Sequence, residues 1–209
     1  MAGARAYPIS NMNEVRDILR LVDAKNPIIR LLFEFEIRTG LRYVDASKVK
    51  WSDVKINGVW RQSFTVVQSK SFNKRMTCGQ REANARRDSS LTIHMNSELI
   101  ALLEDLESFT GKYQLLFQST HHLAKPNRPI TIQYVNRVLK QIAVQLALPY
   151  QLSTHSMRKT FALILLEKKA GIHDLRELLG QSSLTATDHY VGTFLDTNKS
   201  FTDQISFTI

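Results

Sequence analysis

The sequence predicts an α+β domain that is mainly α-helical, with a small antiparallel β-sheet on one side. Two observations predict this fold class. Apolar residues recur at helical spacing behind capping residues along most of the chain. In the first half, two β-type runs flank Asn57-Gly58, a dipeptide typical of tight hairpins.

Two expected helices precede the strands. Asn11 and Glu14 form a capping pair for the first, and Pro27 starts the second, which Gly40 ends in a left-handed cap. Their apolar residues are Val15, Ile18, Leu19 and Val22 in the first, and Ile28, Leu31, Leu32 and Phe35 in the second. We expect the turn at Gly40 to direct Arg42 out of the packed body, where a ligand can meet it.

The expected strands run from Trp51 to Lys55 and from Trp60 to Gln68, on either side of the hairpin turn. A short strand from Leu91 to Ile93 closes the sheet. The stretch before it, residues 71–90, is polar and basic. We therefore expect an extended loop there, longer than a common hairpin turn.

Helices dominate the second half of the chain. The first is followed by a short buried run, Leu115–Phe117, and by a break at Pro126–Pro129. Pro149 ends the second helix and Gly180 closes the fourth. The five expected helices begin at Asn96 or Ser97, at Thr131, at Ser153 or Thr154, at Ile172 and at Ser183.

Composition bounds the class of protein. The 209 residues can form one large domain or two small ones, and 43% of them are hydrophobic, enough to bury a sizeable core. No apolar run approaches the ~20 residues of a membrane span, and the N-terminus lacks the apolar region of a signal peptide. These features predict a soluble, cytoplasmic protein.

The charge predicts a polyanionic partner. The net charge is +9 and the pI is near 9.8. Neutralised phosphates release counterions, so this balance favours nucleic acid, although a basic protein without such a role has the same composition. The one cysteine, Cys78, excludes an internal disulfide and lies in a hydrophilic stretch, where we interpret it as incidental. No metal site is expected, because His121 and His122 are adjacent and not at chelating spacing.

A histidine and an arginine open one of the expected helices. His155 and Arg158 are three residues apart and so share a face in its first turn. Backbone N–H groups and the positive end of the helix dipole favour an anion there. The pair forms either a phosphate clamp or a solvated helix cap.

Together with the stretch Phe35–Trp51, this region resembles the tyrosine recombinases, the phage-integrase family of DNA strand-exchange enzymes. Arg42 in Thr39-Gly40-Leu41-Arg42 matches the first catalytic arginine of that family, and Asp45 matches its acidic neighbour. His155-Ser156-Met157-Arg158 matches the H-x-x-R box. Leu178–Ser183 matches the L-L-G-H-S-S turn, and Tyr190 falls at the nucleophile position. These matches come in family order and extend from about Ile9 to Tyr190.

The resemblance implies a role for each matching residue. Tyr190 attacks the scissile phosphate and forms a 3′-phosphotyrosyl bond, and His155 positions or accepts the proton. Lys70 protonates the 5′-oxygen, with Lys74 as its local competitor. Arg42 and Arg158 grip the phosphate oxygens with forked donors, and Asp45 supports the arginine and the histidine. The bond energy stays in the covalent link, so no ATP, metal or other cofactor is needed.

One position departs from the family pattern. Gln181 stands where the family most often has a histidine. Glutamine can donate a hydrogen bond to a phosphate oxygen but cannot exchange a proton. We expect cleavage to be retained at a lower rate.

Seven basic residues are expected to contact DNA phosphates. Five lie in the expected loop, which either orders against the DNA backbone or is a mobile insertion, and two face outward from the helix after Thr131. They are Lys74, Arg75, Arg81, Arg86 and Arg87 in the loop, and Arg137 and Lys140 on the helix. His173 and His189 are expected to have surface or packing roles.

The expected organisation is a linker or tail over residues 1–9, a catalytic domain over residues 10–191, and a polar C-terminal tail over residues 192–209. The tail either packs on a neighbouring protomer or frays. The expected partners are double-stranded DNA and further copies of the chain, as a dimer or tetramer, and no membrane or small-molecule substrate. Two other functions share these residues: a DNA-binding accessory protein that has lost turnover, and a type IB topoisomerase.

Overall fold

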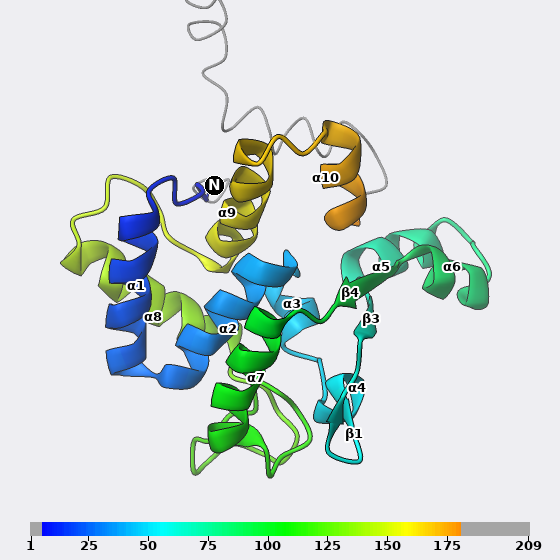
Figure 1. The fold of residues 1–209 in the computed structure, drawn as a ribbon, viewed down its shortest axis with the longest axis horizontal. Coiled ribbons are helices and arrows are strands. Elements are labelled where there is room, and N and C mark those ends of the chain that lie inside the picture. Colours follow the sequence, from blue (N-terminus) through cyan, green and yellow to red (C-terminus); the bar gives the residue numbers. More distant parts are fainter. Residues whose placement is uncertain (1–5, 181–209) are drawn as a thin grey trace, which may run out of the picture.

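A computed structural model describes residues 6–180, and it confirms a mainly helical α+β fold (Figure 1). Helix α2 (Pro27–Thr39) lies at the centre and packs against α1 (Met12–Lys25), α7 (Ser97–Thr110) and α9 (Thr154–Glu167). Helix α8 (Ile132–Gln145) packs against α1 and α9. The buried side chains of these helices form one large core.

The expected helix signals act at the expected residues. The Asn11 side chain caps α1, Pro27 is the first residue of α2, and Thr131 caps α8. The Asn26 side chain is an additional cap, which accepts from the N–H groups of Ile28 and Ile29. Asn96 starts α7. Helix α8 ends at Gln145, before Pro149, and Ala147 then takes a positive φ of 48°.

The antiparallel sheet is two separate two-stranded sheets. Strands β1 (Lys55–Ile56) and β2 (Val59–Trp60) pair around Asn57-Gly58, and β3 (Ser63–Val67) pairs with β4 (Ser90–His94). The hairpin turn is confirmed: Asn57 and Gly58 have φ values of 50° and 80°. The single strand expected over Trp60–Gln68 is wrong, because the chain leaves one pair at Trp60 and enters the other at Ser63.

The strand expected at Trp51–Lys55 is also wrong over most of its length. Residues Trp51–Val54 form a helical turn, α4, which follows the short helix α3 (Tyr43–Ala46). The Asp53 carboxylate accepts the Lys50 N–H at 2.8 Å, and the Trp51 indole donates to the Thr110 carbonyl at 3.0 Å. These side-chain bonds favour a capped turn over a strand with the same apolar alternation.

The basic stretch between β3 and β4 is not an extended loop. It forms two helices, α5 (Ser69–Thr77) and α6 (Glu82–Asp88), which pack on each other and project from the strands (Figure 1). We call residues 69–88 the arm. Helix α5 buries no residue, so no apolar stripe indicated it. Polar contacts hold the arm together, including Gln80 Nε2 to Asp88 Oδ2 at 2.7 Å and the Arg86 guanidinium over the Phe72 ring.

The two ends of the described chain lie against α9. The Ile9 side chain is 1% exposed, and its N–H donates to Thr160 Oγ1 at 3.0 Å. At the other end, α10 (Ile172–Leu178) rests on α9 through a small second core of Ala162, Leu175 and Leu179. Helix α9 is therefore contacted by both the first and the last parts of the described residues.

Within residues 6–180, no helix has both the length and the apolar character needed to cross a membrane. In the same range, no three His, Cys, Asp or Glu side chains are grouped so that they could hold a metal ion.

Gly40 provides a test of the turn that leads to Arg42. Its φ is 64°, and an added Cβ would lie 2.4 Å from Phe161 Cε1. Gly58 also has positive φ, at 80°, but nothing lies within 4 Å of an added Cβ. Both alanine variants incur the left-handed backbone cost of about 1–2 kcal/mol. Gly40→Ala should lose about 1–3 kcal/mol more than Gly58→Ala, the usual cost of overpacking. Urea denaturation measures the difference, and equal losses would contradict tight packing at Gly40.

Candidate active site

Arg42 leaves the left-handed turn at Gly40 and precedes α3. Its Nη1 donates to Gln68 Oε1 and lies 3.9 Å from Asp45 Oδ2. The side chain is 18% exposed. We expected the turn to direct Arg42 out of the packed body. The Arg42 side chain is instead half-buried, because Gln68 and Asp45 hold its guanidinium.

Asp45 connects Arg42 to the start of the arm. Its residue is 1% exposed, and its Oδ1 accepts the Ser69 N–H at 2.9 Å while Oδ2 faces Arg42. Lys70 is the next residue after Ser69, so this bond fixes the backbone from which the Lys70 side chain extends. The sequence predicts that Asp45 supports both Arg42 and His155. Within residues 6–180, its carboxylate faces Arg42 and no hydrogen bond joins it to His155.

Arg158 is among the largest fully buried side chains, at 1% exposure. Its Nη2 donates to the Leu179 carbonyl at 2.7 Å, and its Nη1 donates to the Gly40 carbonyl. Ser153 caps the helix as expected. The interpretation of Arg158 as part of a solvated cap is wrong: two backbone carbonyls from distant segments orient its guanidinium.

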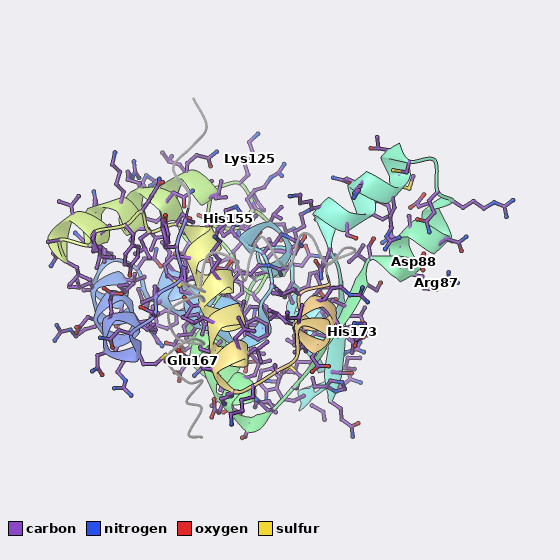
Figure 2. The ribbon with its side chains drawn as sticks, turned by 90° about the horizontal axis from the view of Figure 1, so that it is seen from above. Arg87, Asp88, Lys125, His155, Glu167 and His173 are labelled. Atoms are coloured by element: carbon purple, nitrogen blue, oxygen red, sulfur yellow. The ribbon has the colours of Figure 1, made fainter. Side chains whose placement is uncertain are left out.

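His155 lies one turn before Arg158, at the start of α9, with Glu167 at the other end of the helix (Figure 2). His155 is exposed. Desolvation lowers the pKa of His155, and the positive charges of Arg158, Arg42, Lys159 and Lys70 lower it further. Four positive charges from three segments of the chain therefore act on one imidazole.

Lys70 and Lys74 differ in their relation to this site. Both are exposed on α5, and the charge of Lys70 is among those that lower the pKa of His155. Lys70 lies in the first turn of α5, beside the bond from Ser69 to Asp45.

Sequence reasoning missed three residues of the site. Gln68 is 1% exposed and bridges Arg42 to the Leu179 carbonyl, which its Nε2 contacts at 3.2 Å. Glu36 is fully buried; burial raises the pKa of its carboxyl well above its usual range, and the charge of Arg158 opposes that rise. Lys159 donates to the Ala6 carbonyl at 2.8 Å.

Sequence signals were present for two of these residues. Glu36 falls on the apolar face of α2, one turn after Leu32, where an acid requires an explanation. Gln68 ends a β-type run two residues before Lys70. Nothing in the sequence marks Lys159, because its partner is a backbone carbonyl from a segment expected to be a linker.

The residues expected to contact DNA lie on two elements. Lys74, Arg81, Arg86 and Arg87 are exposed on the arm, whereas Arg75 is half-buried with its Nη1 4.0 Å from Asp88 Oδ2. Arg137 and Lys140 are exposed on α8. In Figure 2, the arm, marked by Arg87 and Asp88, and α8, in yellow-green, extend to opposite sides of His155.

Several remaining predicted residues lie away from the site or outside the described range. His173 is exposed on α10, with its Nε2 3.8 Å from Glu177 Oε1, as a surface residue should be. Cys78 is exposed at the end of α5. Gln181, His189, Tyr190 and the C-terminal tail fall beyond residue 180 and so outside the described residues.

The phage integrase family matches residues 11–194 of the sequence. The chain belongs to the phage integrase family. The integrase fold is also found among solved structures. A lambda integrase dimer bound to a COC′ core site superposes with a TM-score of 0.68 at 19% identity, over 100% of this chain and 53% of that one. XerH bound to palindromic difH superposes with a TM-score of 0.65 at 20% identity, over 95% of this chain and 53% of that one.

Curated relatives of this integrase-family chain carry recombinase names. The probable integrase/recombinase YoeC of Bacillus subtilis is 24% identical over 196 residues, which cover 92% of this chain and 93% of YoeC. The tyrosine recombinase XerC of Pediococcus pentosaceus is 27% identical over 154 residues, which cover 73% of this chain and 45% of XerC. The chain therefore spans nearly the whole length of one relative and about half the length of the other.

The electrostatics of His155 can be tested by removing one of its cations. Arg42→Gln should raise the pKa of His155 towards its ordinary value, because it deletes a positive charge that disfavours the imidazolium. An NMR pH titration of the His155 ring measures the change. Arg61→Gln is the matched control, since Arg61 is exposed and bonds to Ser52 elsewhere on the surface. Equal shifts in both variants would contradict a local effect of Arg42.

Proposed function

We propose that this chain is the catalytic part of a site-specific DNA recombinase that cleaves and rejoins DNA through a 3′-phosphotyrosyl intermediate. The observation that carries the proposal is the hydrogen-bonded link between the two arginines, which runs from Arg42 through Gln68 to the Leu179 carbonyl that Arg158 also contacts. The positive charges of both arginines and of Lys70 also act on His155. These three positive charges would stabilise a phosphodiester, whose negative charge grows during displacement at phosphorus. They also favour the neutral form of the imidazole.

The arginines would neutralise the phosphate. A guanidinium is permanently charged and presents donors in a fixed fork, which matches the non-bridging oxygens. In this site each guanidinium already has protein acceptors that fix its plane: Gln68 and Asp45 for Arg42, and the Gly40 and Leu179 carbonyls for Arg158. Donors fixed before the substrate arrives need little reorganisation during the reaction.

His155 would act as the proton acceptor for Tyr190. A lowered pKa keeps its imidazole neutral near pH 7, the form that can take a proton from the phenol. An arriving phosphate offsets the surrounding cations and so raises the affinity of the ring for that proton. The phenolic oxygen forms its bond to phosphorus, the bond from phosphorus to O5′ breaks, and Lys70 supplies a proton to O5′. A 5′-hydroxyl reverses the step.

We also propose a DNA interface on both sides of this site, formed by the arm and by α8. Support comes from the exposed cations of both elements and from their positions on either side of His155 (Figure 2). Lambda integrase and XerH were solved on their DNA substrates, and lambda integrase as a dimer and as a tetramer. We propose that this chain likewise binds duplex DNA and self-associates on it, in the cytoplasm, where chromosomal, plasmid and phage DNA are found.

The same proposal assigns roles along the chain. Residues 10–191 form the catalytic domain, residues 1–9 are a linker or tail, and residues 192–209 are a tail that packs on a neighbouring protomer. Ile9 is buried in the core and bonds to α9, and the Ala6 carbonyl bonds to Lys159, so the last residues of this segment pack on the catalytic domain.

The covalent step is tested by trapping. We expect an SDS-stable adduct between the chain and a labelled duplex that carries a randomised segment beside a nick, since the nicked fragment diffuses away and prevents rejoining. Tyr190→Phe should abolish the adduct, because it removes the attacking oxygen. Tyr113→Phe, which changes a partly buried tyrosine beside Lys112, should retain it.

Two other outcomes would replace the proposal. Sequence-independent binding without an adduct from any duplex would favour a DNA-binding accessory protein. Relaxation of supercoiled plasmid by the monomer would favour a type IB topoisomerase.

The arm is tested by its salt dependence. Changing Lys74, Arg81, Arg86 and Arg87 together to Gln should weaken binding to random-sequence duplex DNA. It should also reduce the slope of log K against log salt by up to about 0.9 for each lost phosphate contact. The charge-matched control changes four exposed cations away from the arm, namely Arg16, Arg20, Lys25 and Lys112. Fluorescence anisotropy at several salt concentrations measures both variants, and equal losses would contradict an interface on the arm.

A further inference from the structure

Gln68 connects three parts of the molecule through its backbone. It follows the last residue of β3, and its N–H donates to the Ser89 carbonyl at 2.8 Å, which closes the strand pair at the base of the arm. Its carbonyl accepts the Phe72 N–H at 2.9 Å and so starts α5. The backbone position of Gln68 is therefore fixed from both sides.

Its side chain turns inward and is 1% exposed. Oε1 accepts from Arg42 Nη1, and Nε2 donates to the Leu179 carbonyl at 3.2 Å. Arg158 Nη2 donates to the same carbonyl at 2.7 Å, and Arg158 Nη1 donates to the Gly40 carbonyl. Gly40 is two residues before Arg42, so these four hydrogen bonds and that short piece of chain form a closed ring.

The Gln68 amide is also closely packed against Gly180. Gly180 has a φ of 55°, and a Cβ added there would lie 1.8 Å from Gln68 Nε2. Glycine is favoured here by its positive φ, and any side chain would have to displace the amide of Gln68. The turn that leads to Gln181 therefore rests directly on Gln68.

Few side chains can occupy this position. The closed ring of hydrogen bonds requires a side chain that accepts from Arg42 and, on the same planar group, donates to the Leu179 carbonyl. Methionine fills the space and offers neither. Ionised glutamate offers the acceptor but sets a second oxygen against the Leu179 carbonyl, whereas protonated glutamic acid offers both an acceptor and a donor.

We propose that Gln68 is a positioning residue that couples the two arginines of the site and orients the Leu179–Gly180 turn. It acts through Arg42 and the Leu179 carbonyl and does not itself contact the phosphate. The role rests on the proposed function only in naming phosphate as the anion that the arginines bind.

The first measurement requires no catalysis. Sulfate, a phosphate-like dianion whose charge is constant across this pH range, is titrated into the protein and followed by the His155 ring resonance. Gln68→Met should weaken sulfate binding about 10- to 100-fold, by analogy with the loss of residues that orient metal ligands. The matched control is Gln118→Met, because Gln118 is equally buried at 2% exposure and bonds only to Ser119 within the described chain. Its sulfate affinity should be unchanged.

Two further measurements separate positioning from a loss of folding. In an Arg42→Lys background, Gln68→Met should weaken sulfate binding less than about 3-fold, because the group that it orients is already gone. Gln68→Glu, compared with the parent protein at each pH, should regain sulfate affinity as pH falls and its carboxyl takes up a proton. Gln68→Met should show no such recovery, and this contrast remains informative if the methionine variant is unstable.

Three results would overturn the proposal. They are unchanged sulfate affinity in Gln68→Met, full additivity with Arg42→Lys, and a Gln68→Glu variant whose deficit is the same at every pH. Single-turnover DNA cleavage should fall in parallel with sulfate affinity. If the parent protein cleaves no DNA, the proposed recombinase activity fails while the sulfate titrations still decide the role of Gln68.

Discussion

The carbonyl of Leu179 is the acceptor on which the site depends. It receives a hydrogen bond from Gln68 and another from Arg158, and those two side chains lead to Arg42 and to the Gly40 turn. Three segments therefore meet at one oxygen atom, and the Gly40–Arg42 segment is joined to it through Gln68 and Arg158. A backbone acceptor suits this position, because it carries no net charge that would cancel the arginines and its direction is set by the helix end behind it.

That helix end needs a support of its own, and α10 is short. A small core of Ala162, Leu175 and Leu179 places α10 on α9, separately from the large core of the domain. Burial of only a few apolar side chains contributes a few kcal/mol, so the hydrogen bonds to the Leu179 carbonyl are a substantial part of what orients this turn. The site and the local fold therefore stabilise each other.

The charge balance around Arg158 follows from the same burial. Its guanidinium is almost fully enclosed, and the Glu36 carboxyl is enclosed near it. Desolvation favours the neutral form of the acid, whereas the arginine favours the ionised form. The net direction is a raised pKa, so burial outweighs the arginine and favours the neutral carboxyl.

Helix signals, the hairpin turn and the family motifs were readable from the sequence, because each depends on a few neighbouring residues. Pro27, Asn57-Gly58 and the left-handed Gly40 are examples. The arm was missed, because polar contacts such as Gln80 to Asp88 replace the apolar stripe that reveals most helices. Gln68 was missed for a related reason: its role depends on a carbonyl 111 residues away, and no local pattern encodes such a partner.

The segment before α1 has a mechanical consequence. The Ala6 carbonyl and the Ile9 N–H are bonded to Lys159 and Thr160, the two residues that directly follow Arg158. A force applied to the polypeptide upstream of Ala6 would load these two bonds first. Tension on this end of the molecule would therefore reach the anion-binding helix before it reached any other element.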